Sequence, residues 1–258
     1  MNLRRYAAML LVFLIVTLFG ASVITFALVN VLPGDVAVMI LGTSAGEEQV
    51  AELQQQLGLN QPLYIRYFDW ITGVLQGDLG TSLRFGDPVA QLILQRFPAS
   101  AFLAVSALTI AVLVAIPLGV IAAMEQNTWK DFLASITAFT GISLPNFFWG
   151  MVLILLIARY ASVLPPSGYV SPIDNLEGAF AHVLLPAGAL GFSLMAHLTR
   201  MTRSSLIEEL RSGYVELAKM KGLANRRIVY RHALRNAFLP VLTVIGFQLG
   251  FLFGGIII

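Results

Sequence analysis

The most informative stretch of this chain is Tyr214-Val-Glu-Leu-Ala-Lys-Met-Lys-Gly222-Leu-Ala-Asn-Arg-Arg-Ile228-Val-Tyr-Arg-His232-Ala-Leu-Arg235-Asn-Ala-Phe-Leu-Pro240. It lies between two apolar segments and is strongly basic, with nine Lys and Arg residues against three Glu residues from Arg200 to Arg235. This pattern indicates a loop held against a membrane surface. On charge and periodicity alone, a basic amphipathic helix lying on anionic lipid fits it equally well.

The stretch also contains the signals of two helices. Apolar residues before Gly222 recur every three or four positions, which is the spacing of one helix face. Glycine enters the left-handed conformation without a steric penalty, so Gly222 predicts the end of the first helix. Asn225 is the predicted N-cap of the second. The apolar face of the first helix carries Leu206, Leu210, Tyr214 and Leu217, widened by Ile207 and Ala218, and the second carries Ile228, Val229 and Ala233.

Composition places most of the chain in a membrane. Of its 258 residues, 57% are hydrophobic and 12% are charged, and the mean hydropathy is +0.80. Soluble domains carry about 25% charged residues. The chain has no cysteine, which excludes disulfides and thiolate metal sites.

Five uncharged runs reach the length of about 20 residues that a membrane span needs, so an all-α polytopic helix bundle is expected. The first begins after Arg4 and Arg5, and its apolar core is too long for a cleaved signal peptide. The runs fall within 1–34, 97–124, 132–158, 178–199 and 236–258.

The positions of Lys and Arg predict the orientation. With the N-terminus in the cytoplasm, twelve of the sixteen basic residues are cytoplasmic, nine of them in the loop 200–235. Nine of the fourteen acidic residues then lie outside. The segment 35–96 is therefore expected to be extracytoplasmic.

The segment 35–96 is expected to form short helices. Ser44 and Glu47 have capping-box spacing for a helix that runs to about Leu57 and stops at Gly58. A second helix is expected to begin at Pro62, and its apolar face would carry Ile65, Phe68 and Ile71.

Proline marks the remaining helices. Asp87 and Pro88 fit the N-cap and N1 positions of a helix that leads into the second span. Proline inside a membrane helix frees a carbonyl and bends the helix. Each of the last four spans contains such a proline, at Pro117, Pro145, Pro186 and Pro240 respectively.

The residues around Gly222 also carry a family resemblance. Glu216-Leu-Ala218, followed four residues later by Gly222, resembles the EAA loop of ABC-transporter permease subunits. Lys221-Gly222-Leu, followed by Arg231-His232-Ala-Leu-Arg235-Asn-Ala and Leu239-Pro240, is similar to the dipeptide and oligopeptide branch of that family. Two residues depart from the general motif: Leu217 replaces its usual alanine, and Arg235 stands where it has proline.

The segment 35–96 resembles the same branch through Pro33-Gly-Asp35, Leu57-Gly-Leu59 and Gly77-Asp-Leu-Gly80-x-Ser82. Two roles stay open for it. It either docks the binding protein of the transporter or forms a small structural cap on the pore mouth.

The resemblance implies a type I ABC importer permease-like bundle in the cytoplasmic (inner) membrane of a bacterium or archaeon. Family members continue beyond a point similar to Ile258, so five of six spans are expected here. The implied partners are a second homologous permease subunit, two ATP-binding-cassette ATPase subunits, an extracytoplasmic solute-binding protein and the lipid bilayer. ATP would bind to the partners, and this chain would hold no cofactor, bind no nucleic acid and catalyse no reaction.

In this family the loop is a cytoplasmic coupling helix that docks into a cleft on the ATPase. The apolar side of the 206–217 helix is expected to fill that cleft. The resemblance does not choose between dipeptides, oligopeptides, nickel chelates, glutathione and oligosaccharides as substrates. The residues that it assigns to the coupling loop are Leu210, Tyr214, Glu216, Leu217, Ala218, Lys221, Gly222 and Leu223.

Two other functions remain as alternatives, an ion-coupled secondary carrier and an intramembrane enzyme. The chain has no phosphate-binding Gly-x-x-x-x-Gly-Lys-Ser/Thr loop and no His-Glu-x-x-His motif. Its histidines, His182, His197 and His232, are scattered, which favours structural roles over metal binding. A carrier usually keeps a carboxylate at bilayer depth, and the sequence shows no carboxylate pair there.

Polar residues inside the spans are candidates to line a passage, although packing or bonding to their own backbone is the favoured role for each of them. They are Thr25, Ser106, Thr109, Thr137, Thr140, Ser143, Asn146 and Gln248.

Overall fold

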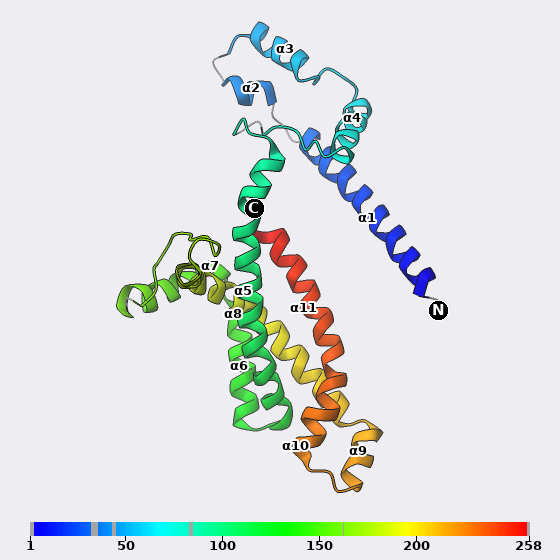
Figure 1. Cartoon of the computed structure of the whole chain (residues 1–258), viewed down its shortest axis with the longest axis vertical. Helices are drawn as coiled ribbons and strands as arrows, with labels where there is room; N and C mark the ends of the chain where they lie inside the picture. The colour runs from blue at the N-terminus through cyan, green and yellow to red at the C-terminus, as the bar shows by residue number, and fades with distance from the viewer. Residues whose placement is uncertain (1–2, 32–35, 43–44, 83–84, 162, 257–258) are drawn as a thin grey trace. The chain divides into compact units, whose positions relative to one another are not determined.

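The computed structural model describes residues 3–31, 36–42, 45–82, 85–161 and 163–256, and these are helices joined by turns and loops (Figure 1). The one β-bridge among them pairs Thr81 with Pro88. The all-α fold predicted from the sequence is confirmed. The chain divides into two compact units, residues 1–95 and 96–258.

The first unit is built around α1, which is long, apolar and mostly exposed. Helix α4 contacts it through Tyr67, which is 9% exposed. The Tyr67 hydroxyl is 2.8 Å from the Ser22 hydroxyl, and the Tyr67 ring meets Phe26 edge-on with the ring centroids 5.4 Å apart. The helices of this unit are α1 (Leu3–Val31), α2 (Val36–Leu41), α3 (Glu47–Gln56) and α4 (Leu63–Leu75).

Two details of this unit correct the sequence analysis. The N-cap of α3 is Gly46, whose backbone N–H donates to the Gln49 side chain; Ser44, like Pro33–Asp35, lies outside the described residues. Helix α4 begins after Pro62 as predicted, but its buried residue is Tyr67, and Phe68 is 61% exposed. Since α1 is apolar on all sides, the reach of the Tyr67 hydroxyl to Ser22 decides which face of α4 packs.

The second unit is organised around α8, which packs against α6, α7 and α11. The elements that follow α4 are α5 (Val89–Met124), α6 (Trp129–Ser143), α7 (Asn146–Leu153), the π-helical η1 (Ile154–Ala161), α8 (Leu176–Leu210), α9 (Gly213–Met220), α10 (Asn225–Arg227), the π-helical η2 (Ile228–Ala233) and α11 (Leu234–Ile256).

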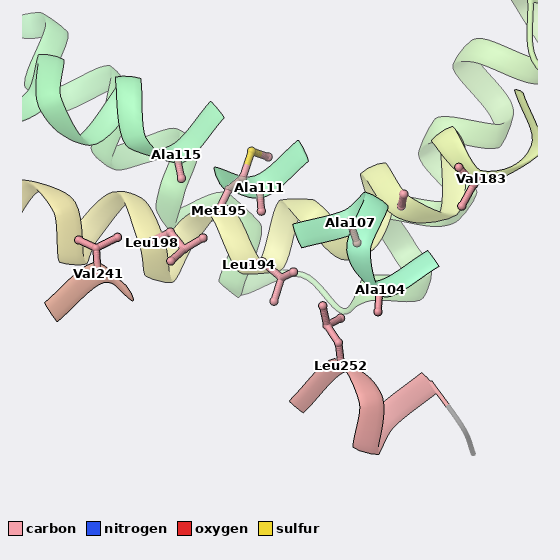
Figure 2. Close-up of a cluster of buried hydrophobic side chains, with 11 residues drawn as sticks. Ala104, Ala107, Ala111, Ala115, Val183, Leu194, Met195, Leu198, Val241 and Leu252 are labelled. Carbon is pink, nitrogen blue, oxygen red and sulfur yellow. The ribbon is translucent and has the colours of Figure 1, made fainter. Parts of the chain in front are cut away.

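A stripe of alanines on α5 forms the centre of the core (Figure 2). It packs with Leu194 and Leu198 of α8 and with Val241 and Leu252 of α11. Small side chains allow helix backbones to approach closely inside a membrane, where van der Waals packing holds helices together. The fully buried members of the stripe are Ala104, Ala107, Ala111 and Ala115.

Glycines bring two neighbours especially close to α8. A Cβ built on Gly119 of α5 would lie 2.6 Å from the Thr202 Cβ. A Cβ built on Gly141 of α6 would overlap the Phe192 carbonyl oxygen. Any larger residue at either position must therefore push its helix away from α8.

The described residues contain four helices that are long and apolar enough to cross a membrane, or five if a bent pair counts as one span. This agrees with the five predicted spans. The bent pair is α6 and α7, which turn by 104° at Pro145, because the residue before proline, Leu144, is extended with ψ 140°. The prolines of the other three spans lie inside continuous helices.

Candidate functional site

The basic loop starts as a continuation of α8, which runs to Leu210, beyond the predicted end of the fourth span at residue 199. Arg211 and Ser212 then separate α8 from α9. The Ser212 hydroxyl donates to the Glu209 carbonyl at 2.6 Å, and Gly213 follows. Serine favours helix ends because its side chain competes for backbone hydrogen bonds. The prediction of a single helix across residues 206–217 is therefore wrong.

This break resets the helix register and changes which residues face the core. Leu206 is fully buried in a cluster of this chain's own side chains and is not available to a partner, so its predicted place in a partner's cleft is wrong. Val215, which the periodicity of one long helix missed, is also fully buried there. Within α9 alone, Val215 and Ala218 have the i, i+3 spacing of one inward face. The other buried members of the cluster are Val120, Ala123, Ile228, Val229, Ala233 and Ala237.

The structure divides the eight predicted coupling residues into two groups. Leu210, Ala218 and Leu223 are half-buried and pack against the cluster around Leu206. The exposed group is Tyr214, Glu216, Leu217, Lys221 and Gly222.

The exposed side of α9 has an apolar centre. Leu217 is 49% exposed, and Met220, which the sequence analysis did not select, is 77% exposed. Met220 could have been predicted from the sequence, because it follows Leu217 by three positions and residues three apart share a helix face. The charged residues Glu216, Lys219 and Lys221 surround these two side chains in sequence. This side of α9 therefore combines an apolar contact area with charges of both signs.

Gly222 ends α9 as predicted, with a φ of +76°. Its N–H donates to the Lys219 carbonyl at 2.9 Å, and the N–H of Leu223 donates to the Ala218 carbonyl at 3.2 Å. These two bonds form a Schellman motif, which satisfies the last carbonyls of a helix. No described atom lies within 4 Å of a Cβ built on Gly222, so conformation alone demands glycine within this chain.

The second helix of the loop starts one residue earlier than predicted. Asn225 is the first residue of α10, and the extended residue before it, Ala224, is the N-cap. Because the Schellman motif fixes the chain through Leu223, Ala224 is left to turn into the helix. The predicted apolar face is confirmed, since the described structure buries all three of its residues, Ile228, Val229 and Ala233.

Tyr214 connects three helices through its hydroxyl. The hydroxyl donates to the Glu209 carboxylate in the last turn of α8 and accepts a 3.2 Å hydrogen bond from the Asn236 amide in the first turn of α11. Burial raises the pKa of the Tyr214 phenol, and the Glu209 carboxylate beside it acts in the same direction. The phenol therefore stays protonated, as a donor, at physiological pH.

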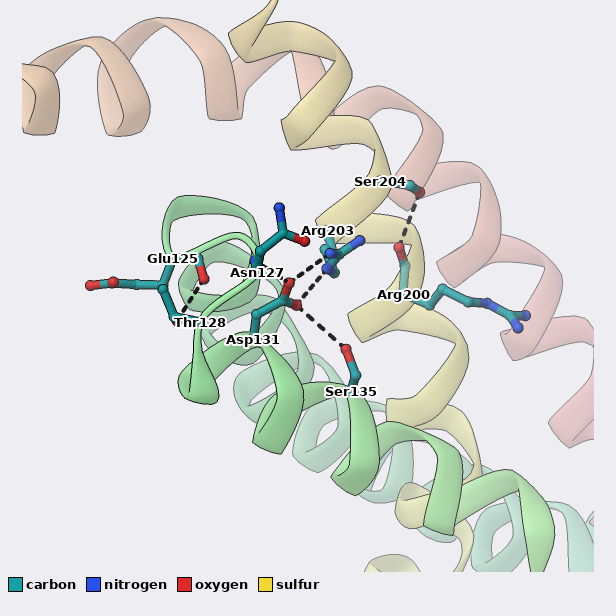
Figure 3. A network of polar contacts seen from close by, with 8 residues as sticks. All are labelled: Glu125, Asn127, Thr128, Asp131, Ser135, Arg200, Arg203 and Ser204. Atoms are coloured by element: carbon teal, nitrogen blue, oxygen red, sulfur yellow. Dashed lines mark hydrogen bonds and ion pairs between the residues drawn. The ribbon is translucent and has the colours of Figure 1, made fainter.

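A buried ion pair holds the turn between α5 and α6 against α8 (Figure 3). Arg203 donates from Nε and Nη2 to the two Asp131 oxygens, both at 2.7 Å. Asp131 also accepts the backbone N–H of Asn127, a residue with a φ of +63°, at 3.0 Å. The sequence analysis missed this pair, because its members are 72 positions apart in the sequence and leave no local signal.

Several other polar groups of the spans form hydrogen bonds within their own helices. His182 Nδ1 lies 2.8 Å from the Gly178 carbonyl, and His197 Nδ1 lies 3.3 Å from the Ser193 carbonyl. No group of three metal-ligating side chains occurs among the residues that the structure describes. Four of the residues predicted as candidates to line a passage bond through their hydroxyls to the carbonyl four residues earlier: Thr109, Thr137, Thr140 and Ser143.

These features define a multi-pass α-helical membrane protein with a basic, partly exposed helical loop. Comparison with protein families gives the same class. Residues 115–258 match the binding-protein-dependent transport system inner membrane component family, and residues 2–104 match the N-terminal region of such membrane components. The chain belongs to this family.

Individual relatives are similar over nearly the whole chain. The dipeptide transport system permease protein DppB of Escherichia coli K12 is 40% identical, covering 94% of this chain and 78% of that protein. The glutathione transport system permease protein GsiC of Salmonella typhimurium is 39% identical, over 98% of this chain and 80% of its own length. DppB of Alkalihalophilus pseudofirmus is 36% identical, covering 98% of this chain and 82% of that protein.

Proposed function

We propose that this chain is the permease subunit of an ATP-binding-cassette importer for peptides or similar small solutes. The family match and the transport functions named for its relatives support this proposal. The observation that carries the coupling role is the exposed motif Glu216–Gly222, which stands on a short helix anchored to the helices of the core. In this proposal the chain forms part of the translocation pathway and ATP binds to a partner.

The proposed assembly contains a second permease subunit, two ATPase subunits and an extracytoplasmic solute-binding protein. The concentration of Lys and Arg from Arg200 to Arg235 supports a cytoplasmic position for the loop and for the N-terminus. A cytoplasmic loop is where an ATPase subunit can reach the chain.

The exposed side of α9 is the proposed contact with the ATPase. Leu217 and Met220 supply its apolar centre, and Glu216 and Lys221 supply charges at its edge. Apolar centres surrounded by polar rims are common in protein interfaces. Val215 of α9 and Leu210 of α8 pack in the same cluster, so α9 lies against the end of α8 and can act on it. ATP binding on the partner would then favour one arrangement of the membrane helices over another.

Co-purification of the assembled transporter from membranes tests the proposal. Gly222→Trp places a large side chain in the left-handed turn beside the contact area, and we expect loss of the ATPase subunit from the purified complex. The control is Ile173→Trp, which introduces the same side chain at a residue that is 91% exposed and lies outside the loop. The proposal is wrong if the wild-type chain purifies without an ATPase while its membranes still transport solute.

A further inference from the structure

Helix α9 has few covalent constraints on its orientation. It contains eight residues, and only Arg211 and Ser212 connect it to α8. Four residues, Lys221–Ala224, connect it to α10. Such short links determine the position of α9. They do not determine its orientation, so α9 can rotate relative to α8 and α10 unless its side chains prevent this.

The side chains of α9 hold it in two ways, by apolar packing and by hydrogen bonds. Val215 is its one fully buried residue among those described, and it belongs to the cluster around Leu206, against which Ala218 of α9 also packs. Apolar packing on this one face is non-directional and permits rotation. Tyr214, the preceding residue, adds directional hydrogen bonds. One apolar and one directional attachment at adjacent positions together define an orientation.

We propose that Tyr214 is a positioning residue whose hydroxyl joins α9 to α8 and α11, so that the three helix ends move as one body. This proposal rests on the proposed coupling function. It gives Tyr214 a role inside the chain, in addition to the contact with the ATPase that the family resemblance implies.

The chemistry of the three groups suits this role. The hydroxyl donates to Glu209 and accepts from Asn236, so both of its functions are used and each is directed at a different helix. A hydrogen bond to a charged acceptor is about twice as strong as one between neutral groups. Phenylalanine keeps the ring of Tyr214 but removes both bonds. Tyr214 as a residue is 40% exposed, which leaves room for a partner.

Force on the exposed side of α9 therefore has two routes into the membrane helices. The bond to Glu209 transmits the force to α8, which is one continuous helix from Leu176 to Leu210. The bond to Asn236 transmits it to α11. Without the hydroxyl, α9 can swing about Val215 while the ends of α8 and α11 stay in place. The expected defect is a loss of relative order rather than a loss of folding, because water can replace the partners of exposed polar groups.

Spin labels can measure this order directly, because the chain contains no native cysteine. Cysteines introduced for nitroxides at Lys219 of α9 and Leu239 of α11, both exposed, report the distance distribution between the two helices in the assembled transporter. We expect one narrow distribution in the wild type. Tyr214→Phe should broaden it and raise the population of displaced α9 by about tenfold, the effect of losing one charge-assisted hydrogen bond.

The matched control is Tyr230→Phe. Tyr230 lies in the same loop and is 51% exposed, and its hydroxyl has no hydrogen bond with any residue in the described ranges. This control should keep the narrow distribution. Glu209→Gln retains an acceptor oxygen and should also keep it, whereas Glu209→Leu should broaden it as Tyr214→Phe does. All variants should melt close to the wild-type temperature.

Co-purification of the ATPase from the same samples separates the two proposals. Tyr214→Phe should still bring down the ATPase, but solute uptake for each ATP hydrolysed should fall. A wild-type chain that purifies without any ATPase would refute the coupling function, while the distance measurement would still test the helix connection. An unchanged distance distribution in Tyr214→Phe would overturn the positioning role, as would equal broadening in Tyr230→Phe.

Discussion

Removal of the Asp131 carboxylate should destabilise the second unit by an amount that the geometry of its ion pair determines. The Asp131 side chain is 8% exposed and the Arg203 side chain is 29% exposed. Removing one partner of a fully buried pair costs about 3–5 kcal/mol, because the other charge is left without compensation. Arg203 can partly reach water, which places Asp131→Ala near the lower end of this range, at about 3 kcal/mol.

The reverse change leaves the more deeply buried charge behind. Arg203→Ala strands the Asp131 carboxylate, which keeps only the Asn127 N–H and the Ser135 hydroxyl as donors. We therefore expect a cost of about 4 kcal/mol, larger than that of Asp131→Ala. The double variant should cost less than the two single changes together, since neither charge remains buried.

The adjacent ion pair provides the control. Lys130 and Glu125 lie in the same turn at 2.9 Å, but their side chains are 44% and 43% exposed. Glu125→Ala should therefore cost less than about 1 kcal/mol. The assay is the thermal unfolding midpoint of each purified variant in one detergent at one heating rate. Equal midpoints for Asp131→Ala and Glu125→Ala would refute the argument from burial.

Three further predictions follow from glycine conformation, helix contact and ionisation. Gly222→Ala should lower the free energy of unfolding by about 1–2 kcal/mol, because alanine is strained at the positive φ of this position. The control is Gly213→Ala in α9, where a Cβ also meets no described atom within 4 Å; it should be neutral or stabilising in the same unfolding assay. Gly141→Ala should lower the free energy of unfolding by about 1–3 kcal/mol, because the new Cβ overlaps a backbone carbonyl of α8. Gly246→Ala, where the Cβ meets open space, should stabilise α11 slightly. The unfolding midpoint should therefore fall in the first variant and rise in the second. The raised pKa of Tyr214 means that its contribution to stability is complete below the ordinary pKa of 10.0 and is lost as pH rises through the folded pKa. Absorbance titration of wild type minus Tyr214→Phe should show that phenol ionising above pH 10.0, and ionisation below this value would contradict the environment described.

Features that depend on composition and on neighbouring residues could be predicted from the sequence. Low charge and long apolar runs predicted a multi-pass helical bundle, because a bilayer allows a single chain few other ways to satisfy its backbone. Gly222 predicted the turn after α9, since a positive φ is a local property of the residue. The motif from Glu216 to Gly222 indicated the family, and the comparisons agree.

The tertiary structure decided which faces and which charges meet. One periodic pattern ran from Leu206 to Leu217, and only the break at Arg211 and Ser212 shows that Leu206 and Val215 turn into the same core. Helix periodicity assigns a face only while the helix continues, so a two-residue interruption changes the assignment of every residue after it.

The polar connections depended on the tertiary structure even more strongly. Asp131 meets Arg203 across 72 residues, and Tyr214 meets Asn236 across 22. A charged or hydroxyl side chain carries no local sign of its partner. Which partner such a side chain meets depends on the close packing of α8 against its neighbours, because this packing brings distant positions within hydrogen-bonding distance.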